Sequence, residues 1–361
     1  MAGLFDPITF RSVTLRNRIG VSPMCQYWSE DGTASDWHLV HLGSRAVGGA
    51  GLIIAEATAV EPRGRITPQD AGLWKDEQIE PLARSTRFMT QYGATPGIQL
   101  AHAGRKASTD QPWKRTRDKP LTAEQGGWER VAPSPVPFRP GDSPPHELTF
   151  VEIREIQQAF HAATLRALEA GYQWLEFHGA HGYLAHSFHS PLSNKRTDQY
   201  GGSFENRTRF TLETVRVMRS AWPEKLPLSV RLSVTDWVDG GWTTEESVEL
   251  AKLLKKEGVD LLDCSSGYGV PSVQYPVGPG WQVQLSETVR RGAEMPTAAV
   301  GMINDAAQAN AIISEGRADI VLLASEMLRD PYWPFQAAVA LKQFGAVHLP
   351  PPYDYVVQPH A

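Results

Sequence analysis

His178, His181 and Tyr183 lie close together in the segment HGAHGY, directly after a short apolar run over residues 172–177. That run predicts a buried strand, so the three polar side chains are expected at its carboxyl end. In an α/β barrel this end of the strands carries the active site. Two neutral imidazoles and a phenol can donate hydrogen bonds to a substrate oxygen, and the phenol can also deliver a proton. A histidine pair alone is more often structural than catalytic, so both interpretations stay open on these residues alone.

Three more residues of chemical interest lie in or after apolar runs. Arg231 is enclosed by the run LSVRL and needs an anionic or acceptor partner, because an unpaired buried charge is very costly. Gln99 carries an amide that can both donate and accept hydrogen bonds at a strand end. Cys25 follows the first apolar run, where it could be a small buried hydrophobic residue or part of a site. Nothing in the sequence supplies a base for its thiol, so we do not propose nucleophilic catalysis.

The elements that must position these residues alternate along the chain. Short apolar runs predict eight strands, at residues 19–24, 51–58, 95–101, 172–177, 228–232, 261–265, 297–300 and 320–324. Amphipathic stretches predict helices at residues 36–47, 76–92, 151–170, 205–220, 244–257, 283–291 and 305–315. This alternation predicts one α/β domain over residues 1–361, a (β/α)8 TIM barrel. An open doubly wound sheet is the alternative, although no GxGxxG opens a helix after the first strand.

Two segments break the pattern. Residues 104–150 are rich in proline and tryptophan, and a loop this long after the third strand is either functional or mobile. We expect it to form a lid that caps the barrel, with the string GGWERVAPSPVPF as a small hairpin; an insertion without a catalytic part is the alternative. The C-terminal tail, residues 345–361, contains LPPPYDY and is expected to be extended.

Composition limits the class of protein. The chain has 361 residues, of which 41% are hydrophobic and 21% charged, as in ordinary globular proteins. A net charge of −5 gives no reason to expect nucleic acid or an anionic membrane as a partner. The N-terminus lacks the features of a signal peptide and no apolar run approaches the roughly 20 residues of a membrane span, so a cytoplasmic protein is expected. Two cysteines cannot form a disulfide framework or a four-cysteine metal site.

The stretch from Trp174 to Asn206, with HGAHGYL followed by SPLSNKRTDQYGGSFEN, resembles the signature of the Old Yellow Enzyme family of flavin-dependent ene-reductases. Cys25 resembles the cysteine of the bacterial, thermophilic-like or xenobiotic-reductase branch. The resemblance extends from Leu4 to Trp333. It implies non-covalently bound FMN, with NADPH or NADH as hydride donor. The implied substrates are α,β-unsaturated carbonyl compounds (enones, enals and maleimides) and nitro compounds, and the implied assembly is a homodimer or homotetramer.

The resemblance also assigns roles to individual residues. His178 and His181 would hold the carbonyl oxygen of the substrate, and Tyr183 would protonate its α carbon. Cys25 would tune the flavin potential and contact the substrate, and Arg231 would stabilise the reduced ring. Tyr27 and Lys106 complete the implied substrate site. The implied cofactor contacts are Ser22, Pro23, Met24, Cys25, Ala57, Gln99, Arg231, Gly301, Ala324 and Ser325.

One position departs from the family pattern. Relatives usually carry Gly-Arg where this chain has Ala324-Ser325, so the guanidinium expected at the FMN phosphate is missing. Backbone N–H groups and the Ser325 hydroxyl could still hold the dianion, but we expect weaker retention of the cofactor.

Two other functions remain open from the residues. A flavin-binding protein without turnover would carry the same cofactor residues. A metal-dependent barrel hydrolase could use His178, His181 and a carboxylate such as Glu176 or Asp263. The i, i+3 spacing of the two histidines in a loop is a poor ligand signature, so no metal is expected.

Overall fold

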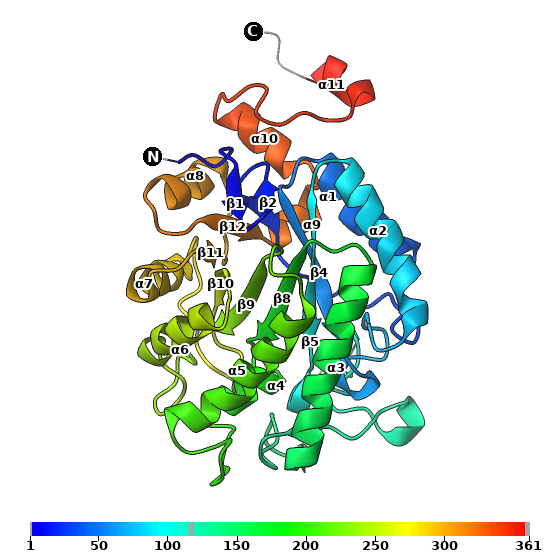
Figure 1. The fold of residues 1–361 in the computed structure, drawn as a ribbon, viewed down its shortest axis with the longest axis vertical. Coiled ribbons are helices and arrows are strands. Elements are labelled where there is room, and N and C mark those ends of the chain that lie inside the picture. The colour runs from blue at the N-terminus through cyan, green and yellow to red at the C-terminus, as the bar shows by residue number, and fades with distance from the viewer. Residues whose placement is uncertain (1, 115, 117–118, 358–361) are drawn as a thin grey trace.

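The computed structural model describes residues 2–114, 116 and 119–357, and shows a closed barrel of parallel strands surrounded by helices (Figure 1). The strands follow one another around the barrel in chain order, and the last pairs with the first. They are β3 (Ile19–Val21), β4 (Leu52–Ala59), β5 (Thr95–Ala101), β8 (Trp174–Gly179), β9 (Leu228–Ser233), β10 (Leu261–Ser265), β11 (Thr297–Ala299) and β12 (Ile320–Leu323). The predicted barrel is thus confirmed and the open sheet excluded. Each predicted apolar run forms a strand whose ends differ from the prediction by at most three residues.

Helices cover the outside of the barrel where the amphipathic stretches predicted them. They are α1 (Asp36–Val47), α2 (Ile79–Gln91), α3 (Phe150–Glu169), α5 (Phe204–Ala221), α6 (Thr244–Lys256), α7 (Val283–Ala293) and α8 (Ala306–Ser314). Their beginnings follow local chemistry: Thr149 caps α3 by accepting from the Glu152 N–H, and the Glu152 carboxylate accepts from the Thr149 N–H in return. The sequence did not predict the short helices α4 (Leu184–His189), α9 (Ser325–Arg329) and α10 (Trp333–Ala340).

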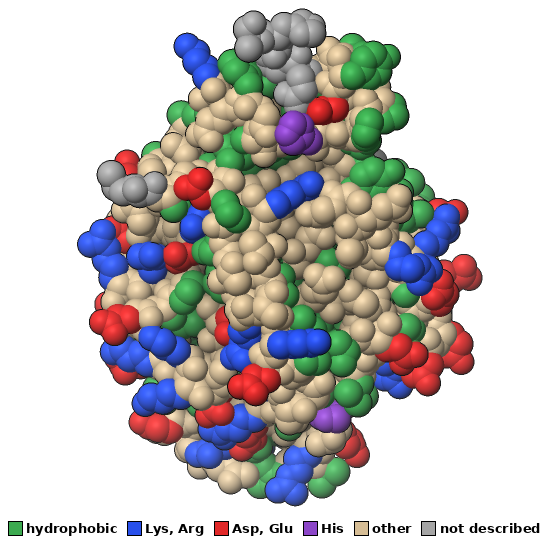
Figure 2. All heavy atoms as spheres, turned by 45° about the horizontal axis from the view of Figure 1, so that its top comes forward, with side chains coloured by type: hydrophobic (Ala, Val, Ile, Leu, Met, Phe, Trp, Pro, Cys, Tyr) green, Lys and Arg blue, Asp and Glu red, His purple; other side chains and the backbone are tan. Residues whose placement is uncertain are grey.

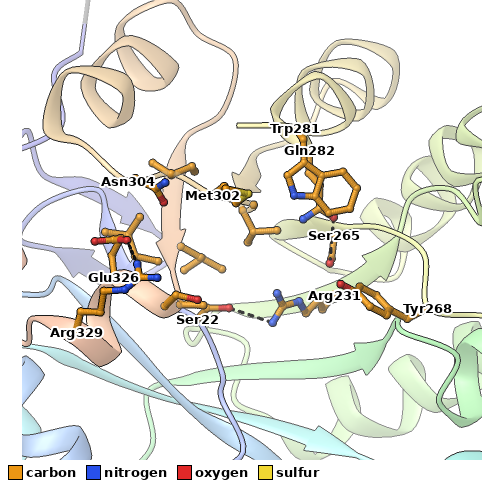
Figure 3. Close-up of a pocket in the computed structure, with 17 residues that line it drawn as sticks. Ser22, Arg231, Ser265, Tyr268, Trp281, Gln282, Met302, Asn304, Glu326 and Arg329 are labelled. Atoms are coloured by element: carbon orange, nitrogen blue, oxygen red, sulfur yellow. Dashed lines mark hydrogen bonds and ion pairs between the residues drawn. The ribbon is translucent and has the colours of Figure 1, made fainter. Parts of the chain in front are cut away.

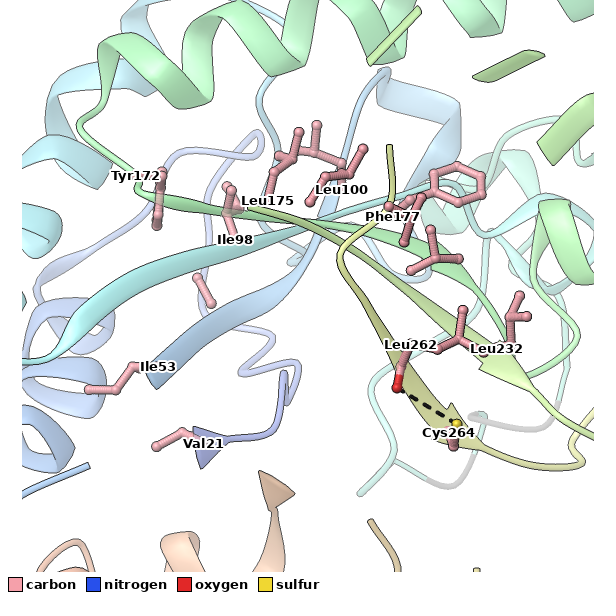
Figure 4. Close-up of a cluster of buried hydrophobic side chains, with 14 of the residues drawn as sticks. Val21, Ile53, Ile98, Leu100, Tyr172, Leu175, Phe177, Leu232, Leu262 and Cys264 are labelled. Carbon is pink, nitrogen blue, oxygen red and sulfur yellow. Dashed lines mark hydrogen bonds between the residues drawn. The ribbon is translucent and has the colours of Figure 1, made fainter. Parts of the chain in front are cut away.

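Alternation along the strands separates an apolar outer layer from the barrel interior. Side chains such as Ile98, Leu175 and Leu262 point outward and form the main core beneath the helices (Figure 4). Cys264 belongs to this layer, so its thiol lies outside the barrel interior. Intervening residues point inward, because successive side chains of a strand lie on opposite faces. Paired strands therefore bring inward-facing polar residues side by side: Gln99 with Glu176, His178 with Arg231, and Arg231 with Asp263.

A hairpin closes the end of the barrel where the strands begin. It consists of β1 (Ile8–Phe10) and β2 (Val13–Leu15), which pack against first residues of barrel strands such as Leu52, Leu261 and Ile320. The Phe10 ring meets the Trp174 ring edge-on, with centroids 5.1 Å apart. Because this end is filled by apolar side chains, the polar residues of the interior lie toward the carboxyl ends of the strands.

The segment over residues 104–150 differs from the sequence prediction. The string GGWERVAPSPVPF does not form a hairpin; instead β6 (Val131–Ala132) pairs in parallel with β7 (His146–Glu147). Pro133, Pro135 and Pro137 explain the difference, because three alternate residues without an N–H cannot donate to an antiparallel ladder. Residues 115 and 117–118 of this segment lie outside the described residues.

The prediction of an extended C-terminal tail is wrong, since α11 (Pro351–Val357) is a helix. Its prolines stand in the first turn, where the missing N–H groups have no intrahelical partner in any case. The Asp354 carboxylate accepts from the Leu349 N–H at 3.0 Å and fixes the chain before the helix. Residues 358–361 of the tail lie outside the described residues.

Basic and acidic side chains are interspersed along both flanks of the face shown in Figure 2. Hydrophobic side chains on the surface include those of α11, where Tyr353 and Tyr355 are exposed. Among the described helices, none is both long and apolar enough to cross a lipid bilayer.

Candidate active site

The fold brings His178, His181 and Tyr183 together as a cluster of three rings, called the His/Tyr cluster below. The His178 ring meets the His181 ring edge-on at 5.3 Å and the Tyr183 ring edge-on at 5.0 Å between centroids. Burial, with Arg231 nearby, lowers the pKa of both histidines well below the ordinary value. Burial raises the pKa of Tyr183. The cluster therefore holds two neutral imidazoles and a protonated phenol at neutral pH, the ionisation states expected from the sequence.

Ser265, the last residue of β10, and Tyr268, which follows that strand, complete the surroundings of His181. Ser265 Oγ lies 2.7 Å from His181 Nε2, and the Tyr268 ring meets the His181 ring edge-on at 5.7 Å. The sequence analysis gave neither residue a role. Ser265 ends the sixth predicted strand and Tyr268 follows it, so their position at a strand's carboxyl end was the available signal.

Left-handed backbone conformations concentrate around this site. Tyr27, His181, Tyr268 and Met302 have φ values of 55°, 61°, 62° and 51°. This region costs about 1 kcal/mol or more for a residue with a side chain, and such residues cluster at functional sites. His181 is held in place by its N–H, which donates to Ser233 Oγ at 2.9 Å.

Cys25, Tyr27 and Lys106 adjoin the His/Tyr cluster. Burial raises the pKa of the Cys25 thiol, and the carboxylates of Asp70 and Glu56 raise it further, so this cysteine stays protonated. Burial also raises the pKa of Tyr27, with contributions from Cys25 and Tyr183. Lys106 Nζ donates to the His181 carbonyl at 2.7 Å and lies 5.0 Å from the centre of the Tyr183 ring.

Arg231 projects from β9 into the barrel beside two carboxyls. Its Nε lies 3.1 Å from Asp263 Oδ2, and its Nη1 donates to Ser22 Oγ at 3.2 Å. Asp263 is thus the anionic partner that the enclosed arginine required. Burial raises the pKa of Asp263 and of Glu176, and repulsion from Asp263 raises that of Glu176 further. The Gln99 amide donates to Glu176 Oε1 at 2.9 Å, deeper in the barrel.

A cavity of about 440 Å³ opens at the carboxyl ends of the strands and is called the barrel-mouth cavity below. Figure 3 shows Ser22 and Arg231 along one side and Arg329 with Glu326 beyond Ser22. Other lining residues include Ser265, Gln282, Gly301, Ala324 and Ser325. Gly301 has a φ of 101°, and a methyl group there would lie 2.7 Å from Gln282 Nε2. A side chain at Gly301 would therefore collide with Gln282, so the backbone stays bare at this point of the cavity wall.

The expected site residues separate into two groups that meet at the strand ends. Of the expected cofactor residues, Ser22, Arg231, Gly301, Ala324 and Ser325 line the barrel-mouth cavity. Those that do not line it are Pro23, Met24, Cys25, Ala57 and Gln99. Cys25 lies with Tyr27 beside the His/Tyr cluster, where the Ala57 backbone hydrogen-bonds to the thiol. Arg329 lines the cavity without having been predicted and pairs with Glu326.

The donors of the barrel-mouth cavity fit FMN. Arg231 places a cation at one part of the wall, and Gly301 and Ser325 offer close backbone and a hydroxyl at another. These groups match a ring that gains negative charge on reduction and a terminal phosphate. Over residues 2–114, 116 and 119–357, no three or more His, Cys, Asp or Glu side chains form a group that could hold a metal ion.

A buried pair beneath the cluster was not predicted from the sequence. His186 Nε2 lies 2.9 Å from Asp236 Oδ1, and both side chains are fully buried. His186 Nδ1 accepts from the Gly182 N–H at 2.8 Å, within the loop that joins His181 to Tyr183. Asp236 therefore supports the His/Tyr cluster through His186. Nothing in the sequence signalled this pair, since its members are fifty residues apart.

Comparisons with known proteins agree with the geometry. The sequence profile of the NADH:flavin oxidoreductase / NADH oxidase family matches residues 3–343. The chain is 47% identical over 340 residues to an NADPH dehydrogenase of Geobacillus sp. (strain WCH70), covering 94% of each chain. It is 44% identical over 354 residues to an NADPH dehydrogenase of Bacillus subtilis (strain 168), covering 98% of each chain.

Solved structures of similar fold include morphinone reductase, with a TM-score of 0.78 and 27% identity over 94% of this chain and 90% of that one. A 2-naphthoyl-CoA reductase complex matches with a TM-score of 0.85 and 26% identity over 94% of this chain, which spans about half (52%) of that longer protein. The chain therefore belongs to the NADH:flavin oxidoreductase / NADH oxidase family and is an FMN-dependent oxidoreductase of the Old Yellow Enzyme type, with a reduced nicotinamide as electron donor.

Proposed function

We propose that this protein is an NADPH-dependent ene-reductase that reduces the C=C bond of α,β-unsaturated carbonyl compounds, namely enones, enals and maleimides, with nitro compounds as further acceptors. The observation that carries the proposal is the His/Tyr cluster: two neutral imidazoles and a protonated phenol around one position, beside the barrel-mouth cavity. NADPH is the proposed donor because the two bacterial relatives are NADPH dehydrogenases.

Hydrogen bonds within the site support two donors aimed at one substrate oxygen. His178 Nδ1 accepts from the Ala180 N–H at 3.2 Å, so the imidazole proton resides on Nε2. When the Ser265 hydroxyl donates to His181 Nε2, the proton of His181 resides on Nδ1. Each histidine then offers one N–H to a carbonyl oxygen, where negative charge develops as a hydride reaches the β carbon.

Tyr183 is the proposed acid. Its raised pKa keeps the phenol protonated, and its ring is in contact with His178, which would hold the oxygen. The phenol would therefore give its proton to the α carbon of the held substrate. When bound, FMN would supply the two-electron chemistry that links the nicotinamide to the substrate.

We propose that Ser22, Arg231, Gly301, Ala324 and Ser325 hold FMN in the barrel-mouth cavity, and that Pro23, Met24, Cys25, Ala57 and Gln99 border its ring. The phosphate would meet the backbone at Gly301 and the Ser325 hydroxyl. Arg329 also lines the cavity, but its guanidinium is paired with Glu326. A phosphate bound mostly by neutral donors is held less tightly than one bound by a free guanidinium.

We also propose that residues 104–150 form a lid over the substrate site. Phe138 supports this role, because its ring lies 4.5 Å from Lys106 Nζ. Arg105 donates to the Val136 carbonyl at 3.3 Å and to the Pro137 carbonyl at 3.4 Å, which holds this part of the segment against the barrel. A lid in this place would exclude water while the hydride is transferred.

A homodimer or homotetramer is the proposed assembly. The exposed side chains of Tyr353, Tyr355 and Val356 on α11 support it, because contiguous exposed apolar surface is typical of protein interfaces.

The double variant His178→Ala/His181→Ala tests the proposed function. A phenol can place its oxygen where both imidazoles donate to it, and its binding can be followed by the absorbance change of bound flavin. The double variant is expected to keep FMN and to lose phenol binding, since both donors to the ligand oxygen are gone. The matched control Tyr183→Phe should retain phenol binding. Unchanged phenol affinity in the double variant would refute the role of the two histidines.

A further inference from the structure

Two neighbouring cations beside the His/Tyr cluster lack an anionic partner. Arg105 is 3% exposed, and its guanidinium donates to main-chain carbonyls, the shortest contact being 2.6 Å to Gly269. Its Nε has no hydrogen-bond partner. Lys106 Nζ donates to the carbonyls of His181 and Tyr268, at 2.7 and 3.2 Å. Among the described residues, no carboxylate lies within ion-pair distance of either side chain, and the charge of Asp236 acts on Arg105 only from beyond that distance.

Such an arrangement is costly unless an anion joins it. Carbonyl oxygens satisfy hydrogen bonds but do not neutralise charge, and two cations held side by side repel each other. Burial lowers the pKa of Lys106 to about 7, and Arg105 and Arg139 lower it as well. Two other arginines near the site do have carboxylate partners: Arg231 pairs with Asp263, and Arg130 lies 3.7 Å from Asp142.

A cavity of about 200 Å³ lies against these two cations, between the barrel and residues 104–150. Its lining includes Tyr27, Arg105, Lys106, Arg130, Phe138 and Arg139. Two carboxylates, Asp110 and Asp142, also line it, but Asp110 accepts from Thr116 and Asp142 lies beside Arg130. Tyr27 and Lys106 line this cavity and also adjoin the His/Tyr cluster. The cavity therefore adjoins the position where the cluster would hold a substrate.

We propose that this cavity is an anion subsite, which binds a carboxylate or phosphate on the same molecule whose reacting end lies at His178 and His181. Lys106 would supply the charge-assisted hydrogen bond, and Arg105 beside it would add a second positive charge to the cavity wall. The inference rests on the proposed function and narrows it to substrates that carry an acidic group away from the reacting carbonyl. A phosphate of the nicotinamide donor is the other source of the same chemistry.

Matched phenols test the subsite by binding alone. On FMN-loaded protein at pH 6.5, the affinity of 3-(4-hydroxyphenyl)propanoate is compared with that of its amide, 3-(4-hydroxyphenyl)propanamide. The acid is expected to bind about tenfold or more tightly, the effect of one hydrogen bond to a charged group. In Lys106→Met this preference should shrink to about twofold or less. The control Lys252→Met removes an exposed lysine that pairs with Glu249 on α6, and should leave the preference intact.

Two further measurements separate the outcomes. Binding of uncharged 4-ethylphenol shows whether His178 and His181 hold a ligand oxygen at all. If 4-ethylphenol does not bind, the proposed function has failed rather than the anion subsite. Titration of the enzyme with NADPH and NADH identifies the source of the anion. If acid and amide bind alike, but Lys106→Met weakens NADPH about tenfold and leaves NADH unchanged, the donor's 2′-phosphate occupies the subsite. Equal binding of acid and amide together with an unchanged NADPH/NADH ratio would overturn the proposal.

Discussion

Replacing Asp236 by asparagine removes one negative charge beneath the His/Tyr cluster. Asp236 is 1% exposed; its Oδ2 accepts from Ser190 Oγ at 2.6 Å and from the Trp242 N–H at 2.8 Å. Burial raises the pKa of Asp236, but His186, Ser190 and the Trp242 N–H outweigh this effect and lower it from 3.8 to about 2. A difference of this size corresponds to about 2 to 3 kcal/mol of stability at neutral pH. We therefore expect Asp236→Asn to unfold with a free energy lower by about that amount.

The pH dependence of this loss has a definite sign. Because the pKa of Asp236 is lower in the folded than in the unfolded chain, its contribution is complete above about pH 4 and disappears as the pH falls toward 2. The gap in unfolding free energy between the variant and the natural protein should thus be largest at pH 7 and should narrow at pH 3. Urea unfolding followed by circular dichroism at the two pH values measures it.

The same substitution should loosen the site. His186 links Asp236 to the Gly182 N–H, so a displaced His186 would release the loop that orients His181 and Tyr183. We expect phenol affinity to fall severalfold while FMN stays bound. Asp239→Asn, at an exposed position of the same loop, is the matched control and should change stability by no more than about 0.5 kcal/mol. Unfolding of Asp236→Asn within about 0.5 kcal/mol of the natural protein at pH 7 would refute the reasoning.

Three further outcomes follow from the geometry. Gly182→Ala should abolish phenol binding, because the φ of Gly182 is 73° and the new methyl would lie 2.4 Å from the Tyr268 carbonyl oxygen. The control Gly202→Ala, at a φ of 83° with open space around it, should lower the unfolding free energy by only about 1 to 2 kcal/mol. Affinity for a carboxylated phenol should fall as the pH rises through about 7, where Lys106 loses its proton, and should be flat over that range in Lys106→Met. FMN should leave the protein during extensive dialysis, because Ser325 stands where relatives carry an arginine; nanomolar retention measured by residual flavin absorbance would contradict this.

The barrel could be predicted from the sequence because its signals are local. Each strand is a short apolar run bounded by turns, and helices begin at residues such as Thr149 whose side chains cap them. Arg231 could be assigned for a physical reason, since a guanidinium inside an apolar run must meet an anion, and Asp263 meets it. The two histidines and Tyr183 were found from their position after a strand.

Features that depend on distant residues could not be predicted. The His186–Asp236 pair joins helix α4 to the loop after β9, which only the closed barrel brings together. Ser265 and Tyr268 acquire their roles through contacts with His181, which lies in the loop after β8, two strands away from β10 around the barrel. The helical tail was missed because its prolines suggested extended chain, whereas the Asp354 contacts and the first-turn position of the prolines permit a helix. Lys106 was expected to bind substrate, but its charge environment became visible only from the fold.

The most direct test of the account is the visible spectrum of the purified protein, followed by anaerobic addition of NADPH and then of cyclohexenone. We expect a two-band yellow flavin spectrum that bleaches with NADPH and returns with the enone, since the His/Tyr cluster would hold the enone oxygen beside the cofactor. A flavin spectrum that bleaches but does not return with any α,β-unsaturated carbonyl compound would contradict the proposed ene-reductase activity. One that never bleaches would instead favour a flavin-binding protein without turnover.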